Sequence, residues 1–275
     1  MRKMSAMHSS PPPVFTFHQG TVPLLVSMPH AGTHVPPDIA QELTTEAQQV
    51  HDTDWHMPQL YAFAKAMGAS LLAATHSRYV VDLNRPPNGE SLYPGQSVTG
   101  LCPVDTFDNT AIYQDGRTEV AADEVQRRKD LYWLPYHAQL QSEVERLLAV
   151  HGKVVLWDAH SIRSVLPRFF EGKLPELNLG TADGKSCASE LAQALLNIAQ
   201  QTSGQTAVLN GRFKGGYITR HYGDPARNIH AVQLEMTQCS YMQENLPFDY
   251  LPERAARIQP TLQQLLKKVL AFATA

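Results

Sequence analysis

The stretch KVVLWDA at residues 153–159 indicates the fold of this chain most strongly. It is a short, continuous apolar run rich in β-branched residues, which is typical of a strand buried in a largely parallel sheet. Further runs of this kind predict strands at 23–28, 69–75, 79–83, 205–209 and 229–236. Many of these runs end at a glycine, a proline or a charged residue.

Segments with helical spacing lie between these runs. They predict helices at 55–67, 119–150, 186–201 and 252–272. Gly68 is a good C-terminal cap for the first helix, and Pro135 predicts a kink or break in the second. Strands that alternate with helices predict an α/β fold, namely a three-layer sandwich around a mixed, largely parallel sheet.

The chain has 275 residues, and no composition shift or repeat marks a second domain. We therefore expect one domain over 14–275. The first thirteen residues, MRKMSAMHSSPPP, lack the apolar core of a secretion signal and are interpreted as a loose leader. The segment 86–116 is rich in Pro, Gly, Asp and Asn, and so long a loop is usually a lid or a wall of a site.

Charge and cysteine content exclude several functional classes. Lysine and arginine number 23 against 26 acidic residues, and the pI is near 6.4, so no nucleic-acid partner is expected. No apolar run is long enough to span a membrane. The three scattered cysteines fit a reducing cytoplasm better than a disulfide framework. The pattern carries no indication of oligomeric state.

Polar residues follow the predicted strands, where ligands bind in doubly wound sheets. They are His30 after 23–28, Asn84 and Arg85 after 79–83, His160 after 153–159, and Glu235 within 229–236. The sequence DTDWH at 52–56 adds two carboxylates at the start of a predicted helix. These residues are the candidates for a functional site.

Two histidines and a carboxylate form a common catalytic zinc set, because three protein ligands leave one position open. We predict that His30, Asp54 and His160 form this set, with Asp52 as the alternative carboxylate; such a set also suits iron or cobalt. The histidines 34, 51 and 56 lie close enough to compete. Without a metal, His30 would be a turn residue, His160 a core histidine bonded to Asp158, and Asp54 a helix cap.

The segment SRYVVDLNRPP at 77–87 places Arg78 and Arg85 on either side of an apolar run. A guanidinium group is a planar fork suited to a carboxylate, and Asn84 adds a donor beside it. An ion pair of Arg85 with Asp82 or Asp54 is the alternative. Ser161 has no GxSxG elbow around it, which argues against a serine nucleophile.

The chain resembles the N-formylglutamate amidohydrolase (deformylase) family. The matching pieces are SMPHAG at 27–32, DTDWH at 52–56, SRYVVDLNRPP at 77–87, LYPG at 92–95, WDAHS at 157–161, FKGGYITRHYG at 213–223 and HAVQLEM at 230–236. They span most of 23–240. The piece at 77–85 is also similar to a segment of the aspartoacylases, which have a zinc carboxypeptidase-like (phosphorylase/hydrolase-like) fold.

This resemblance implies a cytoplasmic zinc amidohydrolase that splits N-formyl-L-glutamate, a small anionic substrate, into formate and glutamate during histidine breakdown. It implies that Arg78 polarises the substrate carbonyl and that Glu235 is the general base. It also implies that Asn84 and Arg85 hold the substrate carboxylate. Arg220 is the candidate for a second cation that binds the side-chain carboxylate.

One departure concerns the carboxylate ligand. Aspartoacylases and carboxypeptidases take two ligands from an HxxE motif, whereas Thr33 stands at the glutamate position after His30. Asp54 is therefore expected to supply the carboxylate. The alternatives are a zinc deacylase of another N-acyl amino acid or a carboxypeptidase, a non-catalytic binder of an acidic metabolite, and a metal-free hydrolase using Ser161 or Cys239.

Overall fold

The computed structural model describes residues 12–92, 95, 98–201 and 204–275. All but the last two residues of the predicted leader lie outside these ranges. So do Tyr93 and Pro94 of the piece at 92–95.

The described residues form a sheet of seven strands in the order β1-β3-β2-β4-β7-β5-β6. The strands are β1 (Phe15–His18), β2 (Leu24–Met28), β3 (Ser70–Ala74), β4 (Val154–Ile162), β5 (Leu177–Gly180), β6 (Ala207–Leu209) and β7 (Ile229–Thr237). The four pairs β2–β3, β2–β4, β4–β7 and β5–β6 are parallel, whereas β1–β3 and β5–β7 are antiparallel. The predicted mixed, largely parallel sheet is confirmed.

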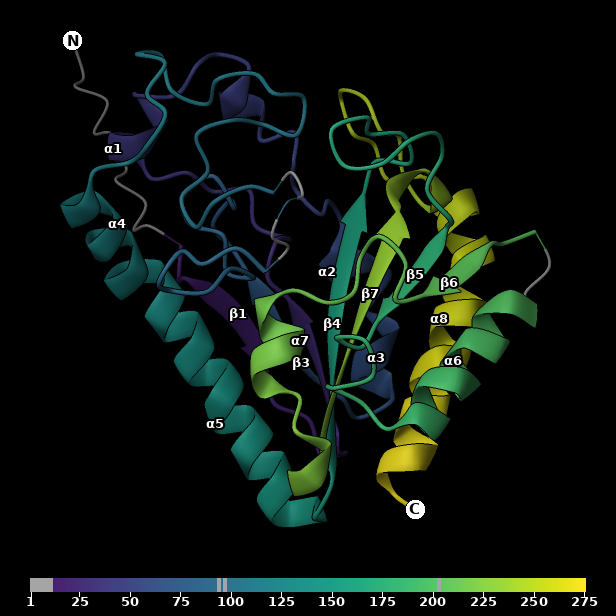
Figure 1. Cartoon of the computed structure of the whole chain (residues 1–275). Helices are drawn as coiled ribbons and strands as arrows, with labels where there is room; N and C mark the ends of the chain where they lie inside the picture. Colours follow the sequence, from purple (N-terminus) through teal and green to yellow (C-terminus); the bar gives the residue numbers. More distant parts are fainter. Residues whose placement is uncertain (1–11, 93–94, 96–97, 202–203) are drawn as a thin grey trace, which may run out of the picture.

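Helices cover both faces of this sheet (Figure 1). The helices are α1 (Pro37–Ala40), α2 (Met57–Leu60), α3 (Phe63–Ala66), α4 (Ala122–Arg128), α5 (Leu134–His151), α6 (Ser189–Gln201), α7 (Tyr217–Tyr222) and α8 (Pro252–Ala273). α5 and α7 lie on one face, and α6 and α8 on the other. In the described part of the chain, no helix combines the length and the apolar character that crossing a membrane requires.

The two faces of the sheet build two separate cores, because successive strand residues point to opposite faces. In β4, Val155 and Trp157 pack with α6 and α8, whereas Leu156 packs with α5 and α7. The same alternation puts His160 on the face of Leu156. The polar end of β4 therefore lies on the side of the sheet that α7 covers.

The strand predicted at 79–83 is wrong. These residues form a buried turn in which the Val80 amide donates to the Ser77 carbonyl and the Arg85 amide to the Asp82 carbonyl. Tyr79 and Val80 pack in a separate small core beside the sheet. The residues of this run are apolar because they are buried. Hydrophobic periodicity alone cannot distinguish a buried turn from a buried strand.

Two predicted helices differ in detail from the structure. The segment 55–67 forms two short helices, α2 and α3, and ends at Gly68, whose φ of +83° fits the predicted cap. The segment 119–150 has a π-helical turn, Lys129–Trp133, between α4 and α5. Pro135, two residues after this turn, lacks the amide that a regular helix would use there, which accounts for the wider turn.

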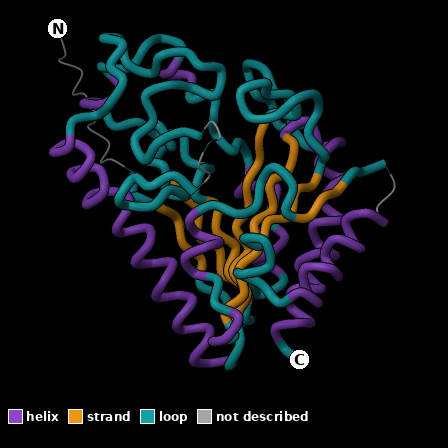
Figure 2. Tube along the Cα trace, viewed as in Figure 1, coloured by secondary structure: helices purple, strands orange, loops and turns teal. Residues whose placement is uncertain are grey.

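Long loops gather beyond one end of the sheet (Figure 2). This end holds the carboxyl ends of β2, β4 and β7, the parallel strands at the middle of the sheet. Among the described residues of 86–116 there is no helix or strand, as predicted for this loop. Val98 and Phe107 from it line a cavity at this end, which confirms its role as a wall.

Candidate active site

The site is built on the neighbouring strands β4 and β7. His160 and Glu235 are directly paired in the register of these strands, so both side chains project from the same face. His30 follows the last residue of β2 by two positions. The amide of Asp54 donates to the carbonyl of His30, 3.0 Å away, which fixes the two loops against each other.

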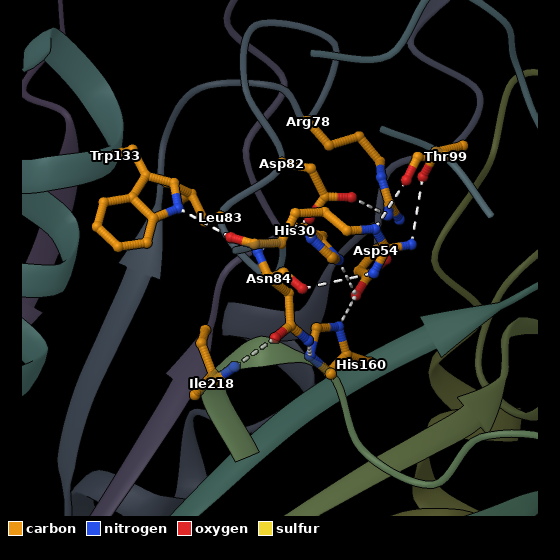
Figure 3. Close-up of polar contacts among 12 residues, drawn as sticks. His30, Asp54, Arg78, Asp82, Leu83, Asn84, Thr99, Trp133, His160 and Ile218 are labelled. Atoms are coloured by element: carbon orange, nitrogen blue, oxygen red, sulfur yellow. Dashed lines mark hydrogen bonds and ion pairs between the residues drawn. The ribbon is translucent and has the colours of Figure 1, made fainter. Parts of the chain in front are cut away.

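His30, Asp54 and His160 converge, and all three are buried. Their candidate ligand atoms lie within 4.8 Å of one another. Asp54 Oδ2 lies 3.1 Å from His160 Nδ1 and 3.8 Å from His30 Nδ1 (Figure 3). Three ligands of a tetrahedral zinc ion stand about 3.4 Å apart when each metal bond is about 2.0–2.1 Å. The spacing of this triad therefore fits a small divalent ion.

Two further carboxylates, those of Asp82 and Asp158, each contact the Nε2 atom of one imidazole. Asp82 Oδ1 lies 2.7 Å from His30 Nε2, and Asp158 Oδ2 lies 2.9 Å from His160 Nε2. A carboxylate at this position makes Nε2 the protonated nitrogen and leaves Nδ1 as a lone-pair donor. Both Nδ1 atoms face Asp54, so the donor set has the chemistry of a metal site.

The competing candidates lie outside this group. Asp52 accepts hydrogen bonds from the Tyr79 hydroxyl and the Phe107 amide, both at 2.8 Å. His56 Nε2 contacts the carbonyl of Phe248 at 2.7 Å. The histidines at 34 and 51 have ring contacts with His76 and Phe248, respectively. Asp54 rather than Asp52 is thus the carboxylate that the structure groups with the two histidines.

Arg78 and Glu235 line the same cavity as the triad. Arg78 Nη2 donates to Asp82 Oδ2 at 2.6 Å, and its guanidinium lies 4.7 Å from the centre of the Phe107 ring. Asp82 thereby joins Arg78 to His30. Burial raises the pKa of Glu235 to about 8, and His160 opposes this shift. A carboxyl with such a pKa is suited to both accepting and donating a proton near neutral pH.

The other ionisable groups respond to the same dense charge cluster. Burial and the neighbouring Arg78 lower the pKa of His30. Burial opposes the charge on His160, but Asp158 and Asp54 outweigh it and raise the pKa of that imidazole. Burial likewise opposes the charge of Asp82, but His30, Arg78 and Arg85 hold its pKa well below the usual range.

Asn84 and Arg85 also line the cavity. Asn84 Oδ1 accepts from the Ile218 amide at 2.8 Å, while Nδ2 lies 3.2 Å from Asp158 Oδ2 and 3.0 Å from His160 Nε2. Its amide therefore supports Asp158, which holds His160, and it supports α7. Arg85 Nε donates to the Thr99 carbonyl at 2.9 Å. This bond leaves Arg85 at the cavity edge with a fixed orientation.

Arg220 is not brought to the cavity. It is absent from the described residues that line the cavity, and its Nε donates to the carbonyl of Gly215. Arg212, in the loop between β6 and α7, lines the cavity instead. Sequence reasoning missed Arg212, although the apolar run at 205–209 ends three residues before it and could have marked it. The neighbouring piece FKGGYITRHYG, which begins at 213, is the signal that marked this part of the chain.

Three comparisons with known proteins bear on this geometry. A sequence model of the N-formylglutamate amidohydrolase family matches residues 22–242. The chain belongs to the N-formylglutamate amidohydrolase family. N-formylglutamate deformylase of Pseudomonas putida is 49% identical over 259 residues, which cover 94% of this chain and 96% of the relative. The corresponding deformylase of Pseudomonas aeruginosa is 48% identical over 259 residues, 94% of this chain and 97% of the relative.

Comparison with solved structures supports the same family assignment. The crystal structure of an N-formylglutamate amidohydrolase from Ralstonia eutropha JMP134 has a TM-score of 0.76 at 28% identity. The match covers 94% of this chain and 96% of that chain. A gene product of Agrobacterium tumefaciens has the same fold, with a TM-score of 0.74. The family resemblance stated from the motifs is thus confirmed.

Proposed function

We propose that this chain hydrolyses N-formyl-L-glutamate to formate and L-glutamate with the help of a divalent metal ion. The proposed ion is zinc, and its ligands are His30, Asp54 and His160. The observation that carries the proposal is the convergence of these three side chains in one cavity with Glu235 and Arg78. Membership of the N-formylglutamate amidohydrolase family supports the substrate.

The carboxylates behind the two histidines support the metal. A divalent ion at this site would supply Lewis acidity to the formyl carbonyl and lower the pKa of water. Glu235 takes a proton from the attacking water and delivers it to the amide nitrogen as the carbon–nitrogen bond breaks. Arg78 retains guanidinium donors beyond the one given to Asp82 and uses them to stabilise the developing oxyanion.

We assign the substrate α-carboxylate to Arg85. Its guanidinium lines the cavity and is oriented by Thr99, which gives a planar fork suited to a carboxylate. Asn84 donates to Asp158, the partner of His160, anchors α7 and lines the same cavity as Arg85. The cleft attracts an anion despite the net charge of −3, because local arginines decide the potential there. We place the reaction in the cytoplasm, in keeping with three free cysteines.

The variant Glu235→Gln tests the mechanism. We expect kcat for N-formyl-L-glutamate to fall by about 10²–10⁴-fold, because the proton carrier is lost. Metal content and thermal stability are expected to stay near those of the parent protein. The matched control is Glu253→Gln, an exposed glutamate at the start of α8. Equal turnover by the Glu235→Gln and parent proteins would contradict the mechanism.

A substrate comparison separates this function from its alternatives. N-formyl-L-glutamate is expected to be hydrolysed with a higher kcat/KM than N-acetyl-L-glutamate or a peptide with a C-terminal glutamate. A preference for the acetyl or the peptide substrate would identify a different deacylase or a carboxypeptidase. Binding of N-formyl-L-glutamate without turnover, by metal-loaded protein, would identify a non-catalytic binder.

A further inference from the structure

The loop that carries Arg212 is anchored on both sides. Before it, the Asn210 amide donates to the Leu179 carbonyl, and the Asn210 side chain exchanges hydrogen bonds with Thr181. After it, the Gly216 amide donates to Gln233 Oε1 at 2.7 Å. Gln233 Nε2 in turn lies 3.5 Å from Glu235 Oε2. Arg212 is thus held by a loop tied directly to the strand that bears the general base.

Aromatic rings fix the Arg212 guanidinium within the cavity. The group lies 5.8 Å from the centre of the Phe169 ring and 5.3 Å from that of Phe213. Arg212 Nε donates to the Phe169 carbonyl at 2.7 Å. Phe169 packs edge-on against Phe107, whose ring lies under Arg78. Such contacts orient a guanidinium group.

The apolar wall of the cavity indicates what Arg212 could bind. Phe107, Ile162, Phe169 and Phe213 give the wall an apolar character. A substrate carboxylate placed against such a wall is costly unless a cation meets it there. Arg212 lines this part of the cavity, between Phe169 and Phe213, and its planar fork matches a carboxylate.

Two arginines reach the cavity from separate segments of the chain. Arg85 follows β3, which is separated from β4 by β2, whereas Arg212 follows β6, which is separated from β7 by β5. Both arginines line the cavity that also holds His160 on β4 and Glu235 on β7. A glutamyl substrate has one carboxylate on its α-carbon and another at the end of its side chain, so two cations in one cavity suit it.

We propose that Arg212 binds the side-chain carboxylate of the substrate and thereby selects glutamate over its neutral amide, glutamine. This assignment rests on the proposed function for the identity of the substrate. It gives Arg212 the role that the sequence alone suggested for Arg220, and it makes Arg212 a specificity residue that takes no part in the chemical step.

The test compares two substrates that differ only in side-chain charge, N-formyl-L-glutamate and N-formyl-L-glutamine. In Arg212→Gln, kcat/KM for the glutamate substrate is expected to fall about 10- to 100-fold, the loss typical of a charged hydrogen bond. The value for the glutamine substrate is expected to change less than about threefold, since it forms no charge pair with Arg212. Arg212→Lys keeps the charge and is expected to retain part of the preference.

Two control variants separate the arginines. Arg85→Gln is expected to weaken both substrates alike, because both have an α-carboxylate. Arg220→Gln is expected to keep the parent preference. A loss of preference in Arg220→Gln, or an equal loss for both substrates in Arg212→Gln and Arg212→Lys, would overturn the assignment.

Calorimetric binding of L-glutamate and L-glutamine makes the test independent of turnover. The parent protein is expected to bind L-glutamate more tightly, and Arg212→Gln is expected to lose this difference. A parent protein that binds L-glutamate through Arg212 but does not hydrolyse N-formyl-L-glutamate would refute the proposed function and leave the assignment intact. An undiminished preference for L-glutamate in Arg212→Gln would refute the assignment alone.

Discussion

His160 is held at both nitrogens, and Asp158 determines which of them faces the proposed metal. Asp158 is fully buried, and its Oδ2 contacts both His160 Nε2 and the Asn84 amide. With Nε2 bound in this way, Nδ1 is left to face Asp54. The orientation of a ligating imidazole therefore depends on a residue that does not itself touch the ion.

Replacing Asp158 by Asn is expected to weaken zinc binding by about 10- to 100-fold, because a neutral amide holds the imidazole less firmly and makes it less basic. Competition with a chromophoric chelator measures this affinity. Asp183→Asn is the control, because Asp183 is an exposed residue paired with Lys214. Unchanged zinc affinity in Asp158→Asn would show that the carboxylate has no such role.

The sequence predicted the triad itself but not the atoms that orient it. His30 and His160 follow apolar runs, and this position is visible in a single sequence. Asp52 and Asp54 stand two residues apart, and only the structure shows that Asp54 is the one that reaches the histidines. Arg212 was missed although it also follows an apolar run, because its place in the cavity depends on the anchors of a loop.

At the scale of elements, α7 is packed so tightly against the site that one position accepts only glycine. A Cβ atom added to Gly216 would lie 2.4 Å from Asn84 Nδ2, closer than real Cβ atoms approach. Asn84 cannot retreat easily, because its amide bonds to the Ile218 backbone and to Asp158. The start of α7 and the site therefore share one packed contact.

Gly216→Ala is expected to destabilise the protein by about 1–3 kcal/mol through overpacking, and to lower kcat/KM through displacement of Asn84. Urea unfolding and deformylase kinetics measure the two effects. Gly100→Ala is the matched control, because a Cβ there meets nothing within 4 Å and its backbone is not left-handed. If both variants behave like the parent protein, the contact between α7 and Asn84 is not required.

Elements were predictable where burial and periodicity agree. The strands at 23–28 and 153–159 are continuous apolar runs, and both are found in the sheet as β2 and β4. β1 is an edge strand with alternating exposure, and β5 is interrupted by Asn178, so neither resembles an apolar run. Asn178 is tolerated in the sheet because its amide donates to the carbonyls of Pro175 and Glu235.

At the scale of the molecule, the fold brings distant segments to one end of the sheet. His30, Asp54, Arg78, His160, Arg212 and Glu235 come from six separate segments and line one cavity. Parallel pairing of β2, β4 and β7 makes this convergence possible, because their carboxyl ends lie together. The sequence predicted this class of sheet and the end that holds the site, whereas the loop contacts that complete the cavity required the structure.

Removing and restoring the metal ion tests the proposed zinc site. Protein stripped with a chelator and given one equivalent of zinc is expected to regain deformylase activity. Its X-ray absorption spectrum is expected to show two imidazole nitrogens and a carboxylate oxygen at about 2.0–2.2 Å. In the variants His30→Ala and His160→Ala one imidazole should disappear from this spectrum. Full activity of the metal-free protein would contradict the proposed zinc site. A zinc ion that still has two imidazole ligands in these variants would contradict it as well.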